Sequence, residues 1–423
     1  MPFYHVWTIG CQMNKADSEH IASYLEQIGY RASPKADEAD IIVLNSCVVR
    51  RSAEDRVINK LDSLKALKRR QNPVLVVTGC IVDSRVDGLR HRYPHVDFFF
   101  QPQAFSELSR FLVERHLAPE GLEPSSVLSR PLPSAFVPII NGCDNFCSYC
   151  IVPYRRGRER SRPVQEIVCE VEGLVARGVK EVTLLGQNVD SYGHDLPQKP
   201  DLAALLGELN QTDSLARIRF LTSHPKDMSD SLIEAMSQFE KVCEHLSLPI
   251  QAGDDNILRA MRRGYAVAHY RGLIDRIRQA IPHIALSTDV IVGFPGEGEG
   301  QFQGTFDLLR ELRFDTVHVA AYSPRPGTIA SRKLADDVPT GVKVRRREMV
   351  EHIQQGIATE INARLLGSTV EVLVEGRKSE KWWGRTRTDK LVFFSDEVDR
   401  LGQLVNVKVE KTSPWSLQGV LAI

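Results

Sequence analysis

The segment 141–160, NGCDNFCSYCIVPYRRGRER, holds the densest group of residues that could do chemistry. It places Cys143, Cys147 and Cys150 within eight positions and follows them with a run of arginines. A cubane iron–sulfur cluster normally takes four thiolates, so a CxxxCxxC loop would leave one iron open to an outside ligand. The alternative is a zinc site that takes its fourth nitrogen or sulfur ligand from a distant part of the chain.

Three further cysteines share a different pattern. Cys11 ends HVWTIGC, Cys47 ends IIVLNSC and Cys80 ends VLVVTGC, each at the carboxyl end of an expected strand. Parallel strands present these ends at one edge of a sheet, where α/β proteins bind their ligands. We therefore expect the three thiols to meet, although free cysteine is also a common buried packing residue. Cys169 and Cys243 have no partner at ligand spacing, and we interpret both as packing residues.

The elements that must position these cysteines follow from the alternation of apolar runs. Residues 1–117 alternate expected strands with amphipathic helices, which indicates βαβ units and a parallel α/β domain. Residues 118–134 are rich in Pro and Ser and are typical of a linker. Residues 364–423 contain short β-rich runs separated by turns, which predict a small antiparallel β-barrel of the OB type.

Residues 135–363 repeat the strand–helix pattern six times. The expected strands are 135–141, 181–188, 217–223, 244–249, 284–293 and 316–323. A complete TIM barrel needs eight repeats, so six predict an open, partial (βα)6 barrel.

Composition sets the class of protein. The 423 residues are 42% apolar and 26% charged, as expected for a soluble globular protein of two to four domains. No run of eighteen apolar residues and no secretory signal is present, so we expect no membrane span and a cytoplasmic location. Eight cysteines in such a chain favour metal binding or catalysis over disulfides. The formal net charge is zero, so an RNA partner must be argued from local basic clusters.

The arrangement CDNFCSYC, set after the first strand of a six-fold βα repeat, resembles the radical S-adenosylmethionine (SAM) enzymes. GCQMN, NSC and TGC ahead of it resemble the methylthiotransferase branch of that family, over essentially the whole chain. GCQMNKADSE, LLGQNVDSYG, CIVPYRRGRERSRP and AYSPRPGT are similar to the subgroup that acts on isopentenylated adenosine in tRNA. The resemblance implies an N-terminal methylthiotransferase domain (1–117), a radical SAM core (135–363) and a C-terminal TRAM domain (364–423).

The resemblance also implies the cofactors and the reaction. Two 4Fe–4S clusters are implied, a radical SAM cluster on Cys143, Cys147 and Cys150 and an auxiliary cluster on Cys11, Cys47 and Cys80. In this family one SAM methylates a sulfide at the auxiliary cluster, and a second is cleaved to a 5′-deoxyadenosyl radical. The radical removes hydrogen from C2 of N6-isopentenyladenosine beside the anticodon, and the methylsulfide couples to that carbon. An unactivated aryl C–H needs a radical, so we assign no catalytic residue beyond the clusters.

Other residues are candidates for binding the cofactor. The resemblance places the backbone of Tyr149 against the adenine of SAM. The carboxyl ends of barrel strands carry active sites, and four polar residues are expected there: Gln187, Asn188, Ser223 and Gln251. A helix cap or a loop hydrogen bond is the alternative for each of them.

Five arginines crowd the eight residues beside the cysteine loop and indicate contacts with RNA phosphates: Arg155, Arg156, Arg158, Arg160 and Arg162. A solvated charge run is the usual alternative. The last domain combines basic residues with Trp382, Trp383, Phe393 and Phe394. That composition suits loop RNA, although the two phenylalanines could also form a core strand.

We expect the partners to be a tRNA anticodon stem-loop and an external electron donor, and we expect a monomer. Two alternatives stay open within the family, a threonylcarbamoyladenosine tRNA or a ribosomal protein as the target. A rival from a different class is a non-catalytic iron–sulfur electron carrier. Such a carrier would need neither six βα repeats, nor the arginine segment, nor an RNA-binding barrel.

Overall fold

The computed structural model describes residues 1–47, 51–82, 86–102, 104–121 and 132–422. The chain divides into two compact units. The first contains residues 1–131 together with 141–144 and 150–160, and the second contains the remainder. Most of the expected linker, residues 122–131, lies outside the described residues. No helix in the described ranges is long and apolar enough to cross a membrane.

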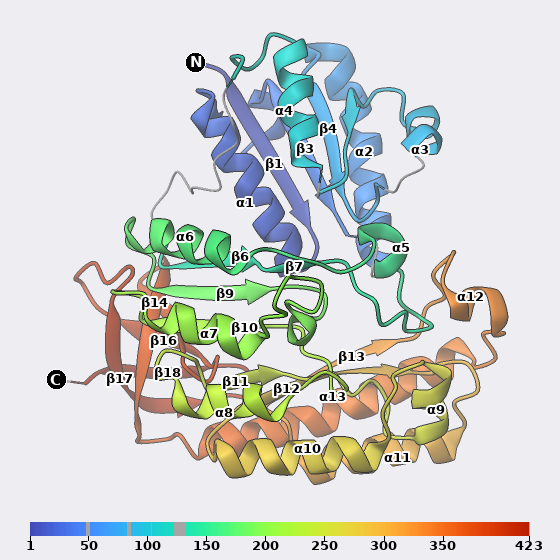
Figure 1. Ribbon diagram of the computed structural model, residues 1–423, viewed down its shortest axis with the longest axis vertical. Helices are drawn as coiled ribbons and strands as arrows, with labels where there is room; N and C mark the ends of the chain where they lie inside the picture. The colour runs from blue at the N-terminus through green and yellow to red at the C-terminus, as the bar shows by residue number, and fades with distance from the viewer. Residues whose placement is uncertain (48–50, 83–85, 103, 122–131, 423) are drawn as a thin grey trace. The chain divides into compact units, whose positions relative to one another are not determined.

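A parallel five-stranded sheet in the order β2–β1–β3–β4–β5 forms the centre of the first unit (Figure 1). Its strands are β1 (Phe3–Ile9), β2 (Arg31–Ala32), β3 (Ile41–Ser46), β4 (Val74–Gly79) and β5 (Phe98–Phe99). Its helices are α1 (Gln12–Gln27), α2 (Arg51–Gln71), α3 (Val86–Arg92), α4 (Phe105–Glu114) and α5 (Val152–Arg156). The expected α/β domain is present, and α5 joins it from beyond the linker.

The sequence of β3 explains why this sheet is covered on both faces. Val43 belongs to an apolar cluster with residues of α1 and α4, whereas Leu44 belongs to a second cluster with residues of α2. All six residues of β3 are buried. A strand buried on both faces reads as a continuous apolar run, as in a doubly wound parallel sheet.

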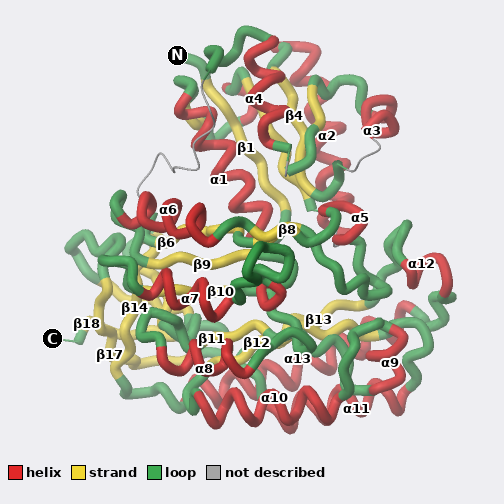
Figure 2. Tube along the Cα trace, viewed as in Figure 1, coloured by secondary structure: helices red, strands yellow, loops and turns green. Residues whose placement is uncertain are grey.

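Six parallel strands form the core of the second unit, as two sheets of order β10–β9–β6 and β11–β12–β13 (Figure 2). A backbone hydrogen bond from Ser223 N to Ser247 O, 3.1 Å long, links the end of β10 to β11. The strands are β6 (Ser134–Pro138), β9 (Glu181–Leu185), β10 (Arg217–Phe220), β11 (His245–Ser247), β12 (Ala285–Val292) and β13 (Thr316–Ala321). Each lies where the sequence predicts a strand, so the partial barrel is confirmed.

Helices alternate with these strands and cover them. They are α6 (Val164–Val175), α7 (Leu202–Asn210), α8 (Asp230–Gln238), α9 (Asp255–Ala260), α10 (Val267–Ala280), α11 (Glu299–Leu312), α12 (Ile329–Lys333) and α13 (Thr340–Ala363). Two short strands, β7 (Ile140–Asn141) and β8 (Arg160–Ser161), pair with one another and bracket the cysteine loop. Cys169 is exposed on α6, so its interpretation as a packing residue is wrong, whereas Cys243 is buried as expected.

The C-terminal strands close into a barrel in the order β14–β15–β16–β18–β17. They are β14 (Thr369–Lys378), β15 (Lys381–Thr386), β16 (Leu391–Ser395), β17 (Leu404–Thr412) and β18 (Leu417–Leu421). Among the described strand pairs, β16–β18 is parallel and the others are antiparallel. Trp382 and Phe394 lie in the barrel core, whereas their neighbours Trp383 and Phe393 are half-buried and alternate to the outer face.

Candidate iron–sulfur centres and RNA-facing surfaces

Three cysteines follow three neighbouring strands of the first unit at the same edge of the sheet. Cys11, Cys47 and Cys80 come directly after β1, β3 and β4, within two residues of each strand end. Ser46, the last residue of β3, pairs in register with the last residue of each neighbouring strand. The Cys80 amide also donates to the Ser46 carbonyl oxygen at 2.7 Å. The parallel register therefore sets the three cysteines at the same carboxyl edge of the sheet.

Two glycines permit the close approach of chain at this edge. Gly79 has φ +94°, and a Cβ added there would lie 2.2 Å from the Ser46 carbonyl oxygen. A Cβ added at Gly10 would lie 2.2 Å from Oδ1 of Asn14. A side chain at either position would collide with its neighbours, so the Gly-Cys pairs of GCQMN and TGC are demanded by packing.

A pair of buried asparagines fixes the turns that carry the cysteines. Asn14 Nδ2 donates to Asn45 Oδ1 at 2.9 Å, and Asn45 Nδ2 donates to the Asn14 carbonyl oxygen at 2.7 Å. Asn14 Oδ1 accepts from the backbone amide of Cys11 at 3.3 Å and from its thiol at 3.4 Å. These hydrogen bonds attach α1 to β3 close in sequence to Cys11 and Cys47.

The chemistry of this edge fits an iron–sulfur cluster. Cys47 and Cys80 are buried, and Cys11 is exposed. Within the described ranges, no three His, Cys, Asp or Glu side chains are grouped closely enough to hold a single metal ion. A cubane cluster binds each thiolate through a separate iron, so its ligands need not surround one point. Thiolates are the soft ligands that such clusters select, and the assignment of this trio to an auxiliary cluster stays a prediction.

The CxxxCxxC loop carries the second trio. The Cys143 amide donates to the Gly157 carbonyl oxygen at 3.2 Å, which fixes the start of the loop. Cys143 and Cys150 belong to the first unit, and Cys147 belongs to the second. Their convergence on one cluster therefore rests on the spacing in the sequence and stays a prediction.

Cys147 has a buried cationic neighbour that the sequence did not suggest. Arg263 is 5% exposed, and its Nη1 donates to Cys147 Sγ at 3.5 Å. Its other donors go to the Pro249 carbonyl oxygen at 2.9 Å and to the Tyr265 hydroxyl at 3.0 Å. A guanidinium held in this way stabilises negative charge on the Cys147 sulfur.

Two of the four strand-end candidates join one hydrogen-bonded cluster at the carboxyl ends of β9 and β10. Asn188 Nδ2 donates to Asp227 Oδ2 at 2.7 Å, and Ser223 Oγ donates to Asp190 Oδ1 at 2.8 Å. The His224 amide donates to the second carboxylate oxygen of Asp190 at 2.9 Å. Burial raises the pKa of Asp190 to about 7. Burial, with the nearby Arg263 charge, lowers the pKa of His224 to about 2, so its imidazole is neutral.

The remaining cofactor candidates are Tyr149, Gln251 and Gln187. Tyr149 is half-buried, and its ring packs edge-on against Phe294 at a centroid distance of 6.5 Å. Gln251 is buried with φ +74°, and its amide donates to the Asp289 carbonyl oxygen at 2.9 Å. Gln187 is half-buried in the turn after β9. These residues stay candidates for binding SAM.

The structure divides the five arginines after the cysteine loop. Arg158 and Arg160 are exposed and Arg155 is half-buried, so these three remain candidates for RNA contact. Arg162 instead braces α6, through an ion pair with Glu170 at 2.6 Å and a hydrogen bond to the Pro138 carbonyl oxygen.

Arg156 differs most from its expected role. Its side chain is 4% exposed and forms an ion pair with Asp17 at 3.0 Å. Burial raises the pKa of the Cys80 thiol, and the Arg156 charge lowers that pKa in part. A buried guanidinium that is already paired in this way is not presented to an RNA phosphate, so we correct the RNA-binding assignment for Arg156.

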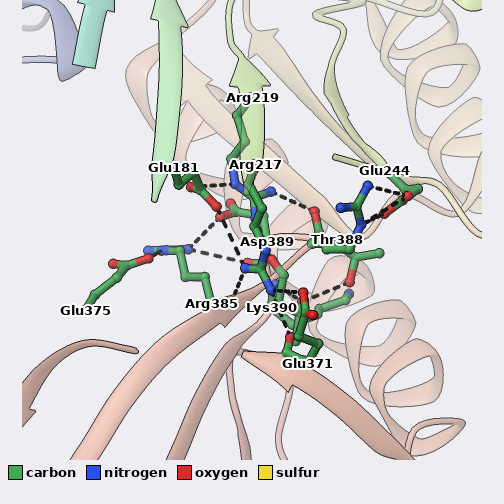
Figure 3. A network of polar contacts seen from close by, with 12 residues as sticks. Glu181, Arg217, Arg219, Glu244, Glu371, Glu375, Arg385, Thr388, Asp389 and Lys390 are labelled. Atoms are coloured by element: carbon green, nitrogen blue, oxygen red, sulfur yellow. Dashed lines mark hydrogen bonds and ion pairs between the residues drawn. The ribbon is translucent and has the colours of Figure 1, made fainter. Parts of the chain in front are cut away.

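A buried polar network attaches the C-terminal barrel to the amino ends of the core strands (Figure 3). Arg219 links the core to the C-terminal barrel. Its Nε donates to Glu181 of the core at 2.8 Å. Its Nη1 and Nη2 donate to the carbonyl oxygens of Arg387 and Thr386 in the barrel. Arg217, fully buried, bonds Glu371 of β14 at 2.7 Å. The C-terminal barrel is attached at the amino ends of the core strands. Asn188 and Ser223 lie at the carboxyl ends, where barrels of this kind carry their active sites. The attachment therefore has a structural role.

Further ion pairs extend this interface. Arg387 forms a bidentate pair with Glu244, with its shortest contacts at 2.8 Å, and Lys390 bonds Asp315 at 2.5 Å. These two basic side chains therefore serve the attachment rather than an RNA surface, and Arg385 contributes its carbonyl oxygen, which accepts from Arg217 at 2.8 Å.

The outer face of the barrel keeps a different set of basic and aromatic residues. Trp383 pairs with Phe393, and Phe393 pairs in turn with Gln418. Exposed Lys381 reaches Gln418 at 3.2 Å, and exposed Lys411 pairs with the same residue in the ladder. We call Lys381, Trp383, Phe393, Lys408, Lys411 and Gln418 the outer barrel face.

Comparisons with known proteins agree with this geometry. Residues 4–101 match a family described as Uncharacterized protein family UPF0004, residues 137–309 match the Radical SAM superfamily, and residues 363–422 match the TRAM domain. Among solved structures, the radical S-adenosylmethionine methyltransferase TsrM from Kitasatospora setae aligns with a TM-score of 0.58 at 14% identity. That alignment covers 78% of this chain and 77% of TsrM. The cobalamin-dependent radical enzyme OxsB aligns with a TM-score of 0.52 at 11% identity, over 83% of this chain and 56% of OxsB.

The fold and the cysteine pattern thus define an enzyme of the radical SAM class. A tRNA-2-methylthio-N(6)-dimethylallyladenosine synthase from Dehalococcoides mccartyi is 51% identical over 100% of this chain and 99% of its own length. One from Chloroflexus aurantiacus is 51% identical over 99% of this chain and 91% of its own length. The chain therefore belongs to the family of tRNA-2-methylthio-N(6)-dimethylallyladenosine synthases.

Sequence reasoning missed several residues that the structure places at these sites. Asn14 occupies the N3 position of α1 behind Cys11, so a search for N-terminal capping pairs would have found it. Asp190 and His224 lie just beyond expected strand ends and could have been added with Asn188. Arg263 lies 116 positions from Cys147 and carries no local signal.

Proposed function

We propose that this enzyme converts N6-isopentenyladenosine beside the tRNA anticodon to its 2-methylthio derivative. The C2–H bond of the adenosine is replaced by C2–SCH3, with the sulfur supplied as a sulfide at the auxiliary cluster. That cluster would also take up the one electron released when the methylsulfide couples to the C2 radical. One SAM supplies the methyl group and leaves as S-adenosylhomocysteine. A second accepts one electron from an external donor and leaves as methionine and 5′-deoxyadenosine, which carries the hydrogen taken from C2.

One observation carries this proposal: the chain presents two separate trios of thiols, each one ligand short of a closed cubane. Cys143, Cys147 and Cys150 would hold the cluster that reduces SAM. Cys11, Cys47 and Cys80 would hold an auxiliary cluster that keeps an iron available for sulfur. A chain that only generated a radical would need one trio. The strand-end trio supports the transfer of sulfur, and the rival reading as a simple electron carrier does not account for it.

The first test asks whether the protein is a radical SAM methylthiotransferase. We expect the anaerobically reconstituted protein to form 5′-deoxyadenosine from SAM when dithionite supplies electrons. We also expect S-adenosylhomocysteine and a methylthiolated product when isopentenylated tRNA is present. Absence of 5′-deoxyadenosine from fully iron-loaded protein would exclude the enzyme and favour the electron carrier.

The second test identifies the substrate. We expect tRNA nucleosides from a strain lacking this protein to contain isopentenyladenosine and no 2-methylthio derivative of it, as measured by mass spectrometry. An unchanged level of 2-methylthio-isopentenyladenosine would refute this target. Loss of methylthiolation from threonylcarbamoyladenosine or from a ribosomal protein would support one of the two alternatives instead.

For the RNA partner we propose two contact surfaces. One comprises the exposed or half-buried arginines after the cysteine loop, Arg155, Arg158 and Arg160. The other is the outer barrel face, whose half-buried aromatic rings and exposed lysines suit stacking and phosphate contacts with an anticodon stem-loop. We further propose a cytoplasmic monomer that takes its electrons from a separate donor protein.

A further inference from the structure

The short helix α5 follows the cysteine loop in the sequence and belongs to the unit that carries the strand-end cysteines. It begins two residues after Cys150 and ends at Arg156, and it belongs to the first unit although it follows the linker in sequence. Ile151, just before α5, is buried in the same apolar cluster as Cys80. The residue that α5 delivers to the strand-end trio is therefore placed by packing and not only by its own hydrogen bonds.

Arg156 pairs with a carboxylate at that edge and acts on a cysteine there. Asp17, on the second turn of α1, pairs with its Nη2 at 3.0 Å. Burial raises the pKa of the Cys80 thiol, and the Arg156 charge lowers that pKa in part. The exposed fractions of the two paired side chains are 4% for Arg156 and 16% for Asp17. Charges that are shielded from water in this way act strongly on neighbouring groups, because little solvent screens them.

Such a pair is costly as a purely structural device. Desolvating two charges commonly offsets their attraction, and apolar residues of the same size would often stabilise the fold better. The pair would have a functional role if it acted on a neighbouring group whose charge changes during the reaction. Cluster ligation makes Cys80 a thiolate, and each electron added to a cluster adds negative charge at this edge.

We propose that Arg156 is a positioning residue of the auxiliary cluster, where its guanidinium orients the Cys80 sulfur and raises the cluster's reduction potential, with Asp17 opposing it. This inference rests on the proposed function, because it takes the strand-end trio to hold a cluster. Arg263, which donates to Cys147 Sγ at 3.5 Å, is a second buried guanidinium beside a cysteine of this chain. Reduction adds one electron, which a nearby cation favours and a nearby anion disfavours.

The two members of the pair should therefore shift the potential in opposite directions. We would use the full chain with Cys143, Cys147 and Cys150 replaced by Ala, so that only the auxiliary cluster contributes. In this parent, R156Q should lower the reduced-to-oxidised ratio at a fixed potential by roughly tenfold, about 59 mV for one electron. D17N should raise the ratio by a similar factor. An electron paramagnetic resonance redox titration measures both, with iron content determined on the same samples.

Two controls separate electrostatics from misfolding. Arg158 pairs with Asp144 on the same segment but is 71% exposed, so R158Q should leave the potential unchanged. R156K keeps the charge and should keep the potential near that of the parent. Loss of iron from R156Q but not from R156K would also support the proposed positioning role.

Shifts in the same direction for R156Q and D17N, or no shift in iron-loaded protein, would overturn this inference. A parent that binds no iron or sulfide after reconstitution would overturn the proposed function and this inference together. If the parent binds iron but neither substitution changes its reduction potential, the inference about Arg156 is overturned and the proposed function is not.

Discussion

At the scale of single residues, the environment of Cys80 disfavours its ionised form. Burial raises the pKa of the Cys80 thiol, although the Arg156 charge beside it lowers that pKa in part. Metal ligation requires the thiolate and so releases its proton. A buried thiol of this kind is a poor nucleophile while it is protonated. Binding to iron would hold it as the thiolate.

We expect Cys80→Ala to remove about half of the protein-bound iron and to abolish methylthiolation, because one of two clusters would lose a ligand. Formation of 5′-deoxyadenosine from SAM should persist, since the other trio is intact. Iron and sulfide analysis after anaerobic reconstitution measures the loss. Cys169→Ala, at an exposed position on α6, should keep the full iron content. Equal iron in both variants would contradict the auxiliary cluster.

Asp190 should make stability depend on pH. Its pKa is raised from 3.8 to about 7 by burial, so the folded state holds a proton that the unfolded state releases. The free energy of unfolding should therefore fall as pH rises from about 4 to 7, by up to about 1.4 kcal/mol per pH unit. In Asp190→Asn this contribution should disappear, and denaturant unfolding of the metal-free chain at several pH values checks it. Parallel pH profiles for wild type and variant would contradict the prediction.

The six cysteines proposed to bind clusters could be selected from the sequence, because three form a CxxxCxxC loop and three follow expected strands. Arg156 could not be separated from its neighbours, because five arginines in eight residues look alike until the fold decides which one is buried. Arg263 could not be found at all, since its contact with Cys147 depends on how distant segments pack. The residue types in the sequence predict the kind of chemistry, but only the packing shows which of several arginines is buried beside a cysteine.

At the scale of elements, the six core strands could be predicted because short stretches rich in apolar residues alternate with helical patterns. In the C-terminal barrel the strand that was not predicted is β15, KWWGRT, where two adjacent tryptophans, a glycine and flanking basic residues give no period-two pattern. Its ladder partners supply the missing information, since Trp382 pairs with Phe394 and Trp383 with Phe393. A strand with one face in a core and one face outward shows its nature only when its neighbours are known.

The attachment of the barrel to the core should depend on Arg219. Removing one partner of a buried ion pair leaves the other charge uncompensated, so Arg219→Ala should lower the free energy of unfolding by about 3–5 kcal/mol. Arg271 and Glu311 form a matched pair in the same unit that is about half exposed, and Arg271→Ala should cost about 0–1 kcal/mol. Denaturant unfolding of the two variants gives the comparison, and equal losses would contradict a role for burial.

At the scale of the whole molecule, a chain with zero formal net charge must bind RNA through local surfaces. We expect the double variant Lys381→Ala, Lys411→Ala to bind isopentenylated tRNA more weakly and with a shallower salt dependence. Each lost phosphate contact should reduce the log–log slope by roughly 0.7–0.9. Filter binding at several salt concentrations measures the slope. Lys35→Ala, an exposed lysine of the first unit paired with Glu38, should change neither quantity. An unchanged slope in the double variant would exclude the outer barrel face.

The membership of α5 in the first unit has a consequence for how the chain is made. A ribosome synthesises residues 1–131 before Ile151 and Arg156. During that interval the nascent first unit lacks part of its core. Segments 141–144 and 150–160 complete that edge only after the second unit has begun to emerge. A chain cut in the linker would lack both residues, and we would expect it to be a poor acceptor of iron even though it retains all three strand-end cysteines.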